Sequence, residues 1–296
     1  VDGVGFWRDM VDIIKEDFSN EYNDVVLVSI DEYQTNEDDY LWSPFNKIAV
    51  VEINGPISSG RNTSNFIFGD IQTGSDEISF TFQQLSKDPF LRGVVLRINS
   101  PGGSILASDQ ILNAVNEFKA LTRKPVYASM GTFAASGGYY VALGSDKIFA
   151  NPATITGSIG VFSGFMNFYD LQKEWGISSE SLSTGKYMDS MSPHQEFSAS
   201  DKAMIQEHQY GSYQHFKSLV QDARQMTDDE VVAVSQGQFL SGSQAKDIGL
   251  VDEIGTYTDA VSAMEDELKL SQSRVVVYGR PQQKSPFDIL SFLFDL

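Results

Sequence analysis

The chain of 296 residues contains no cysteine. Without a thiol it can form no disulfide, no thiolate nucleophile and no cysteine-ligated zinc or iron–sulfur centre. It also lacks a run of about 18 apolar residues, the length that an α-helix needs to cross a bilayer. The first residue is Val1 rather than Met, so we expect a processed or trimmed chain, and removal of an N-terminal signal or membrane anchor stays open.

Basic residues are scarce. Lysine and arginine total 21 against 40 aspartate and glutamate residues, which gives a formal net charge of −19. A chain with this charge repels the phosphates of nucleic acids and the headgroups of anionic lipids. We therefore expect no nucleic-acid partner.

The remaining composition is typical of a folded α/β protein, with 41% hydrophobic residues. Continuous apolar runs predict buried strands, and amphipathic or polar stretches between them predict helices. Because strands and helices alternate, we predict βαβ units and a largely parallel sheet, followed by added C-terminal helices. The predicted strands are Ile48–Ile53, Gly93–Ile98, Pro125–Met130, Lys147–Ala150 and Val275–Tyr278. The predicted helices are Ser75–Leu85, Ser104–Ala120, Ser136–Leu143, Asp201–Gln225, Asp228–Ser235 and Ser241–Asp247.

Three parts are predicted along the chain. Residues 1–46 form an N-terminal extension, with a short helix around residues 6–14, a strand at Val25–Ile30 and an acidic linker. Residues 47–260 form the main domain. Residues 261–296 form a C-terminal extension with an apolar tail at residues 286–296, which is too short to span a membrane. The tail either docks on its own or a neighbouring subunit, or enters an apolar groove.

Two segments carry residues suited to acyl-transfer chemistry. Asn99–Gly103 joins a predicted strand to a predicted helix, and its paired Gly102 and Gly103 can turn backbone N–H groups toward a developing oxyanion. Ser136 lies between small residues at a predicted helix start, where a substrate backbone can approach and negative charge is favoured. The alternatives are an ordinary strand-to-helix turn and a serine that caps the helix.

A serine nucleophile needs a base. The chain has three histidines, His194, His208 and His215, and all lie in the polar C-terminal half, where we expect them on the surface. Lysine can serve instead if desolvation keeps its amine neutral. Lys186 follows a glycine between two predicted helices, and Ser158 could hold its amine by a hydrogen bond. The alternatives are a loop lysine and a turn serine.

Taken together, these segments resemble the signal peptide peptidase A family. The matching segments are Arg97–Gly103, Ala135–Tyr140, Thr156–Gly160, Gly185–Asp189 and Ala245–Gly255, within a resemblance that covers roughly residues 47–260. Each motif is weak alone, but they occur in the family's order and with its spacing: 186 − 136 = 50 and 158 − 136 = 22. The family belongs to the Clp-protease/crotonase superfamily, with a spiral of βαβ units. Gln238 and Ser243 stand where family members often carry an arginine.

The resemblance implies a serine endopeptidase with a Ser–Lys dyad. Ser136 matches the nucleophile, Lys186 the general base and Ser158 the serine that orients the lysine. The N–H groups of Gly137 and of Gly102 or Gly103 would form the oxyanion hole, and no metal or cofactor is required. The family hydrolyses remnant signal peptides, usually as a membrane-associated homo-oligomer. By resemblance we expect an extracytoplasmic location and membrane contact through an N-terminal anchor outside this chain.

Two alternatives from other functional classes stay open at this point. A crotonase-type enzyme acting on acyl-CoA would share the sheet and the glycines, but it would need cationic groups for the CoA phosphates, and the net charge of −19 speaks against it. A non-catalytic scaffold in a membrane complex would need neither Ser136 nor Lys186.

Overall fold

The computed structural model describes residues 46–64, 71–271 and 273–278. The helix and strand predicted within residues 6–30, the acidic linker and the apolar tail at residues 286–296 lie outside the described residues. The three-part division of the chain stays a prediction.

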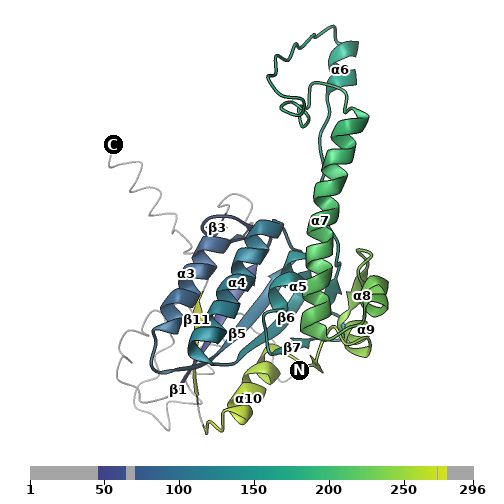
Figure 1. Ribbon diagram of the computed structural model, residues 1–296. Helices are drawn as coiled ribbons and strands as arrows, with labels where there is room; N and C mark the ends of the chain where they lie inside the picture. The colour runs from purple at the N-terminus through teal and green to yellow at the C-terminus, as the bar shows by residue number, and fades with distance from the viewer. Residues whose placement is uncertain (1–45, 65–70, 272, 279–296) are drawn as a thin grey trace, which may run out of the picture. The chain divides into compact units, whose positions relative to one another are not determined.

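The main sheet is largely parallel, as predicted, and its strands alternate with helices in the chain (Figure 1). Eight strands of the described residues form it in the order β10–β7–β6–β5–β1–β11, with β8 paired to β6 and β9 to β8. Each of these pairs is parallel except β8 with β9. The strands are β1 (Asn46–Asn54), β5 (Leu91–Ser100), β6 (Val126–Ala135), β7 (Lys147–Ala150), β8 (Ile155–Gly157), β9 (Phe239–Ser241), β10 (Glu253–Ile254) and β11 (Ser273–Tyr278).

A second, smaller sheet, which the sequence pattern did not predict, lies between β1 and α3 in the chain. It has the order β2–β4–β3 and comprises β2 (Ile57–Ser58), β3 (Thr63–Ser64) and β4 (Ile71–Gly74). These strands have two to four residues, too few to show a clear alternation of apolar and polar side chains.

Six of the helices agree with the sequence prediction to within a few residues, whereas α6 and α10 were not predicted. They are α3 (Ser75–Ser86), α4 (Ile105–Thr122), α5 (Gly137–Ala142), α6 (Tyr169–Glu174), α7 (Ala199–Arg224), α8 (Asp228–Val234), α9 (Gly242–Asp247) and α10 (Tyr257–Glu267). Gly74 is the N-cap of α3, and the Ser75 hydroxyl donates to Gln110 Oε1 on α4 at 2.7 Å. No helix within the described ranges is long and apolar enough to cross a bilayer.

The sheet is buried on both faces, which explains the continuous apolar run in β1. Ala49, Val51 and Ile53 belong to the larger core, which includes buried residues of α3, α4 and α5. Ile48 and Val50 point to the opposite face and pack with Met264 and other residues of α10. Since successive side chains of a strand alternate between faces, a strand covered on both sides must be apolar throughout.

Helix α7 joins the C-terminal segments to the sheet domain through its last turns. Phe216 and Val220 are buried, whereas most earlier residues of the helix are exposed. The Arg224 guanidinium donates to both carboxylate oxygens of Asp252, at 2.6 and 3.0 Å, and to the Gly249 carbonyl oxygen. Burial favours a higher pKa for Asp252, but the hydrogen bonds from Arg224 and from the Ile148 N–H hold that pKa below its ordinary value.

We predict that Asp252→Asn destabilises the protein by about 2 kcal/mol at neutral pH. This is less than the ~3–5 kcal/mol found when a fully buried pair is broken, because 30% of the Asp252 side chain is exposed. Urea unfolding measures the change. In the control Glu253→Gln, whose contact with Lys246 is exposed and 3.9 Å long, we expect a loss of at most about 0.5 kcal/mol.

The same pair predicts a pH dependence. The folded-state pKa of Asp252 is lower than its unfolded value, so its contribution is complete above pH 3.8 and is lost as the pH falls through the lowered pKa. The stability difference between the parent protein and Asp252→Asn should therefore shrink below that pH. A difference that stays constant in acid would contradict this assignment.

Candidate active site

Ser136 has an unusual backbone conformation at the junction of β6 and α5. Its φ is 51° and its ψ is −118°, a combination that is uncommon for a residue with a side chain. The Ser136 N–H donates to the Gly157 carbonyl oxygen at 2.9 Å, and the Ser136 carbonyl oxygen accepts from the Tyr140 N–H at 2.9 Å. Ser136 is the N-cap residue of α5, but its side chain makes no capping hydrogen bond. The hydroxyl is therefore not used to cap the helix.

Gly102 lies directly against Ser136. A Cβ atom at Gly102 would be 2.7 Å from the Gly137 nitrogen and 2.8 Å from Ser136 Cβ, and the φ of Gly102 is 106°. The loop is held from its other side by β2, because the Ile57 N–H donates to the Gly102 carbonyl oxygen and the Ser104 N–H donates to the Ile57 carbonyl oxygen. Only a glycine permits so close a contact with the residues around Ser136.

The two glycine segments bring backbone donors together. A Cβ atom at Gly137 would lie 3.1 Å from the Gly103 nitrogen, so these two residues are immediate neighbours. The Gly102 N–H donates to Ser100 Oγ at 3.1 Å. Within the described part of the chain, the N–H groups of Gly103 and Gly137 have no such acceptor. They are the pair that remains available to an oxyanion.

Ser158 lies beside Ser136 at the end of a neighbouring strand. Ala135 of β6 pairs with Gly157 of β8, and the two serines follow at the next position of each strand. Ser158 also has a positive φ, 49°, and its N–H donates to the Gln238 carbonyl oxygen at 2.8 Å. Parallel pairing of β6 and β8 thus brings together two serines that are 22 positions apart in the sequence.

Lys186 lies in a different environment. It is exposed, and its Nζ atom is 4.8 Å from the centre of the Tyr187 ring. Among the described residues it forms no hydrogen bond with Ser136 or Ser158. The structure therefore groups Ser136, Ser158 and the three glycines, but it does not join Lys186 to them.

The 161–198 segment, which carries Lys186 and α6, exposes many large apolar side chains. Leu182 is 94% exposed and Phe162 is 92% exposed. The others in this segment are Phe165, Met166, Phe168, Tyr169, Leu171, Trp175, Ile177, Tyr187, Met188 and Met191. So many exposed apolar side chains in one segment are typical of a protein–protein or substrate contact.

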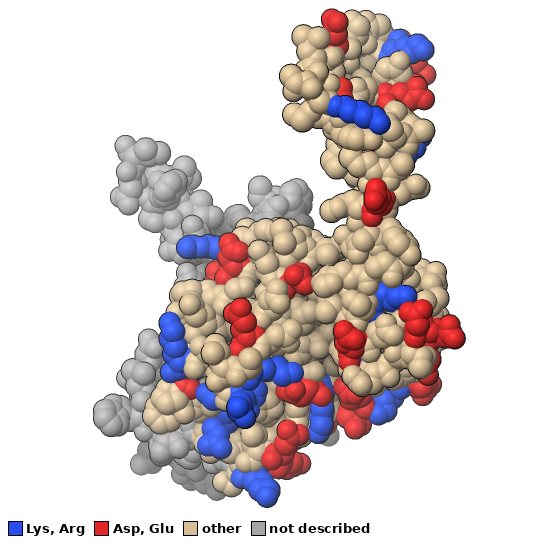
Figure 2. Space-filling model, in the orientation of Figure 1, with Lys and Arg blue, Asp and Glu red and all other residues tan. Residues whose placement is uncertain are grey.

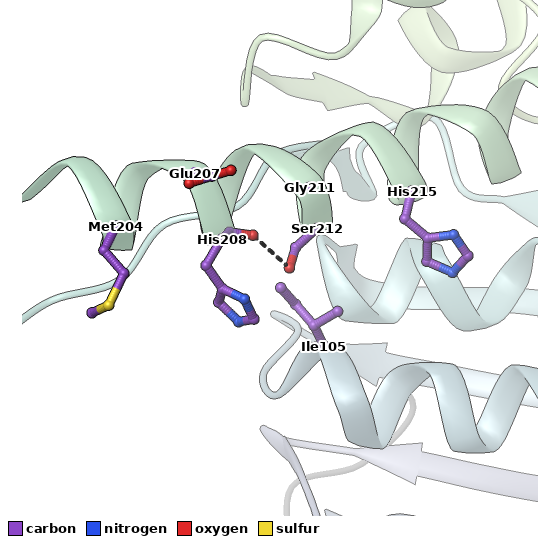
Figure 3. Close-up of a pocket in the computed structure, with 7 residues that line it drawn as sticks. All are labelled: Ile105, Met204, Glu207, His208, Gly211, Ser212 and His215. Atoms are coloured by element: carbon purple, nitrogen blue, oxygen red, sulfur yellow. Dashed lines mark hydrogen bonds between the residues drawn. The ribbon is translucent and has the colours of Figure 1, made fainter. Parts of the chain in front are cut away.

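An open cleft adjoins the glycine loop, between α7 and the first residue of α4 (Figure 3). It has a volume of about 600 Å³ and is lined by Ile105, Met204, Glu207, His208, Gly211, Ser212 and His215. All three histidines, His194, His208 and His215, are exposed, as the sequence predicted. None of them forms a hydrogen bond with Ser136 within the described part of the chain, so the structure offers no histidine base for this serine.

Sequence reasoning missed a polar junction behind Ser136. Tyr140, one turn after Ser136, is buried and donates its hydroxyl to Asp109 Oδ1 of α4 at 2.7 Å. His215 Nε2 of α7 lies 3.5 Å from the same oxygen, and the rings of Tyr140 and Phe216 are 4.8 Å apart. Burial, together with the bond to Asp109, raises the pKa of Tyr140, which keeps it a donor. Asp109 thus connects three helices around the serine.

A second tyrosine fixes the other side of α5. The fully buried Tyr139 donates its hydroxyl to the Leu250 carbonyl oxygen at 2.8 Å. Leu250 belongs to the Ala245–Gly255 segment, which also contains Asp252, the partner of Arg224. The C-terminal motif therefore supports the helix that begins after Ser136.

Comparisons with known proteins give consistent results. The profile of Peptidase family S49 matches residues 119–271. The chain is 34% identical over 232 residues to a putative signal peptide peptidase SppA of Enterococcus faecium, covering 78% of this chain and 67% of that protein. It is 32% identical over 247 residues to a putative protease, MJ0651, of Methanocaldococcus jannaschii, covering 83% and 79%.

Other matches are partial or distant. Protease 4 of Haemophilus influenzae is 34% identical over 252 residues, and the chain spans 40% of that protein's length. Among solved structures, a ClpP1 mutant from Listeria monocytogenes matches with a TM-score of 0.45 and 17% identity, over 72% of this chain and 94% of that one.

The contact between Gly102 and Ser136 gives a prediction. Gly102→Ala should displace Ser136 and lower kcat/KM for hydrolysis of a fluorogenic peptide by about 100-fold, because a shift of roughly 1 Å in a reacting group has that effect. The control Gly60→Ala has a similar φ of 93° but no atom within 4 Å, so it carries the backbone strain without the collision. Equal rates for the two variants would show that the contact is not needed.

Proposed function

The chain belongs to peptidase family S49 and is a serine peptidase; on this premise we propose that Ser136 is its nucleophile. The observation that carries the proposal is the backbone of Ser136, which is held at a positive φ beside two available N–H groups. Because the chain belongs to this family, we discard the two alternative functions, an enzyme acting on acyl-CoA and a non-catalytic scaffold.

The oxyanion hole consists of the N–H groups of Gly137 and Gly103. Gly102 shapes the hole without donating to it, since its own N–H is engaged by Ser100 Oγ. When the Ser136 oxygen attacks a peptide carbonyl, negative charge forms on the carbonyl oxygen and the two N–H groups stabilise it. Each such donor is typically worth about 2.7–4 kcal/mol in the transition state.

Lys186 is the general base and Ser158 orients its amine. The neutral amine takes the proton from Ser136, and the resulting ammonium gives a proton to the leaving amine before water hydrolyses the acyl-enzyme. Because Ser158 already lies beside Ser136, a lysine amine that reaches Ser158 also reaches the nucleophile.

We assign Lys186 to the active site of a neighbouring copy of the chain. The lysine is exposed on the 161–198 segment and is not joined to its own Ser136. Burial of the exposed apolar side chains around it against another surface would be favourable. A second copy that covers them would bring Lys186 to a serine and would desolvate the amine, which favours its neutral form. The working enzyme is then a homo-oligomer.

The proposed substrates are apolar peptides, such as signal peptides that remain after cleavage. The support is the similarity to the putative signal peptide peptidase of Enterococcus faecium and the apolar character of the 161–198 segment. By the same similarity we place the enzyme at the extracytoplasmic face of a membrane, with an anchor outside this chain.

We predict that Ser136→Ala and Lys186→Ala each lower kcat for an apolar fluorogenic peptide by at least about 10³-fold, as removal of either member of a nucleophile–base pair does. The control Lys173→Ala removes another exposed lysine from the same segment and should stay within about twofold of the parent. Full activity of Lys186→Ala would exclude it as the base.

Mixing the two inactive proteins tests the assignment of Lys186 to a neighbour. After subunit exchange, activity should return to roughly a quarter of the parental level, because one interface in four of a randomly mixed head-to-tail ring joins an intact serine to an intact lysine. If no activity returns although exchange is demonstrated by labelled subunits, the lysine acts within its own chain.

A further inference from the structure

The end of the sheet opposite Ser136 carries a group of cations and exposed apolar side chains. It lies at the two connections from α3 to β5 and from α4 to β6, including the adjoining ends of β5 and α4. We name it the basic edge; its residues are Lys87, Phe90, Arg92, Leu121, Arg123 and Lys124. These residues lie at the amino ends of β5 and β6, and Ser136 follows the carboxyl end of β6. The ten residues of β6 put about 30 Å between the two ends.

The two turns are fixed to each other. Lys124 Nζ donates to the Asp88 carbonyl oxygen at 2.9 Å, and Lys47 Nζ contacts the Asp88 carboxylate at 2.7 Å. The Arg92 guanidinium donates to Asn46 Oδ1 at the start of β1. These contacts hold the residues of the basic edge in place at the start of β1, so they form one surface rather than two independent loops.

Several of these cations have no acidic partner among the described residues. Burial lowers the pKa of Lys124, the Asp88 carboxylate raises it, and the positive charge of Arg92 lowers it. Over the ranges that the structure describes, Lys87, Arg92 and Arg123 form no ion pair. The charges of these three side chains therefore remain available to an anionic surface.

Large apolar side chains lie among these cations. Phe90, two residues before Arg92, is 60% exposed, and Leu121, two residues before Arg123, is 77% exposed. A ligand that offers only phosphate groups would need the cations and not the apolar side chains. An aliphatic and an aromatic side chain between cations match the boundary of headgroups and acyl chains in a bilayer.

The net charge of the chain does not oppose this contact. Figure 2 shows lysine and arginine side chains gathered, with acidic ones among them, at the lower end of the sheet, where Figure 1 places the end of α4 and the start of β1. At physiological ionic strength, charges more than about 8 Å away are largely screened. An anionic surface near this end therefore responds to the local charges, of which Asp88, Asp146 and Glu267 are already paired with lysines, more than to the formal charge of −19.

We infer that the basic edge binds the surface of an anionic lipid bilayer, with Phe90 and Leu121 inserted at headgroup level. This contact does not depend on the dyad. It orients the domain so that Ser136 faces away from the bilayer, about 30 Å from its surface. The substrate peptide would then be met outside the membrane.

Co-sedimentation of the full 296-residue chain with phosphatidylcholine vesicles, with and without phosphatidylglycerol, tests the inference. Binding of the chain to the vesicles should require phosphatidylglycerol and should weaken as the salt concentration rises. The triple variant Lys87→Glu, Arg92→Glu, Arg123→Glu should bind at least about 100-fold more weakly, since each cation near an anionic surface contributes roughly fivefold or more. The matched control Arg61→Glu, Lys173→Glu, Lys202→Glu changes the net charge equally and should bind like the parent.

A second variant separates lipid from other polyanions. Phe90→Ser with Leu121→Ser keeps the charge and should weaken vesicle binding about tenfold or more, as loss of buried apolar area does. With a net charge of −19 the parent should bind single-stranded DNA only weakly, and this variant should bind it no less than the parent does. Three results would each overturn the inference. They are equal binding of the parent to vesicles with and without phosphatidylglycerol, equal vesicle binding by the two triple variants, and vesicle binding by the serine variant that equals that of the parent. An unchanged circular dichroism spectrum and a cooperative thermal unfolding transition show that each variant is folded.

Discussion

The candidate site depends on one close backbone contact. Gly102 packs against Ser136 and Gly137 at a distance that leaves no room for a Cβ atom. Three parallel strands, β5, β6 and β8, end around this contact, and their hydrogen bonds hold Ser136 at a φ of 51°. A strained serine conformation persists only where the surrounding structure determines it on several sides. Here those sides are the glycine loop, the β8 strand end and the first turn of α5.

Buried tyrosines connect this contact to the rest of the domain. Tyr139 binds the Leu250 carbonyl oxygen, and Tyr140 binds Asp109, which also lies near His215 of α7. Arg224 and Asp252 join the end of α7 to the same C-terminal segment. This explains why the Ala245–Gly255 motif accompanies the serine motif in one sequence: its residues form the support behind α5.

The candidate site has two parts: one is held at the ends of paired strands, and the other lies on an exposed segment. Ser136, Ser158 and the glycines lie at the ends of paired strands, where register fixes their positions. Lys186 lies on a segment rich in exposed apolar side chains. If burial of that segment against another copy brings the lysine in, assembly and activity are coupled, and an isolated subunit lacks its base. The basic edge lies at the opposite end of β6, so the two contact surfaces do not compete for the same face.

By itself, the sequence determined the motifs, six of the described helices and the longer strands of the main sheet, but it did not predict α6, α10 or the short strands other than β7. The β-branched run of β1, the alternation of strands and helices and the paired glycines are local patterns, and each appears where it was predicted. Tertiary structure alone decided that the Ser136 hydroxyl does not cap α5 and that the Gly102 N–H donates to Ser100 Oγ. It also decided that Asp109 contacts both Tyr140 and His215. Finally, it decided that Lys186 is not joined to its own Ser136. The physical reason is that these facts depend on strand register and helix packing between residues far apart in the chain, which no local pattern encodes.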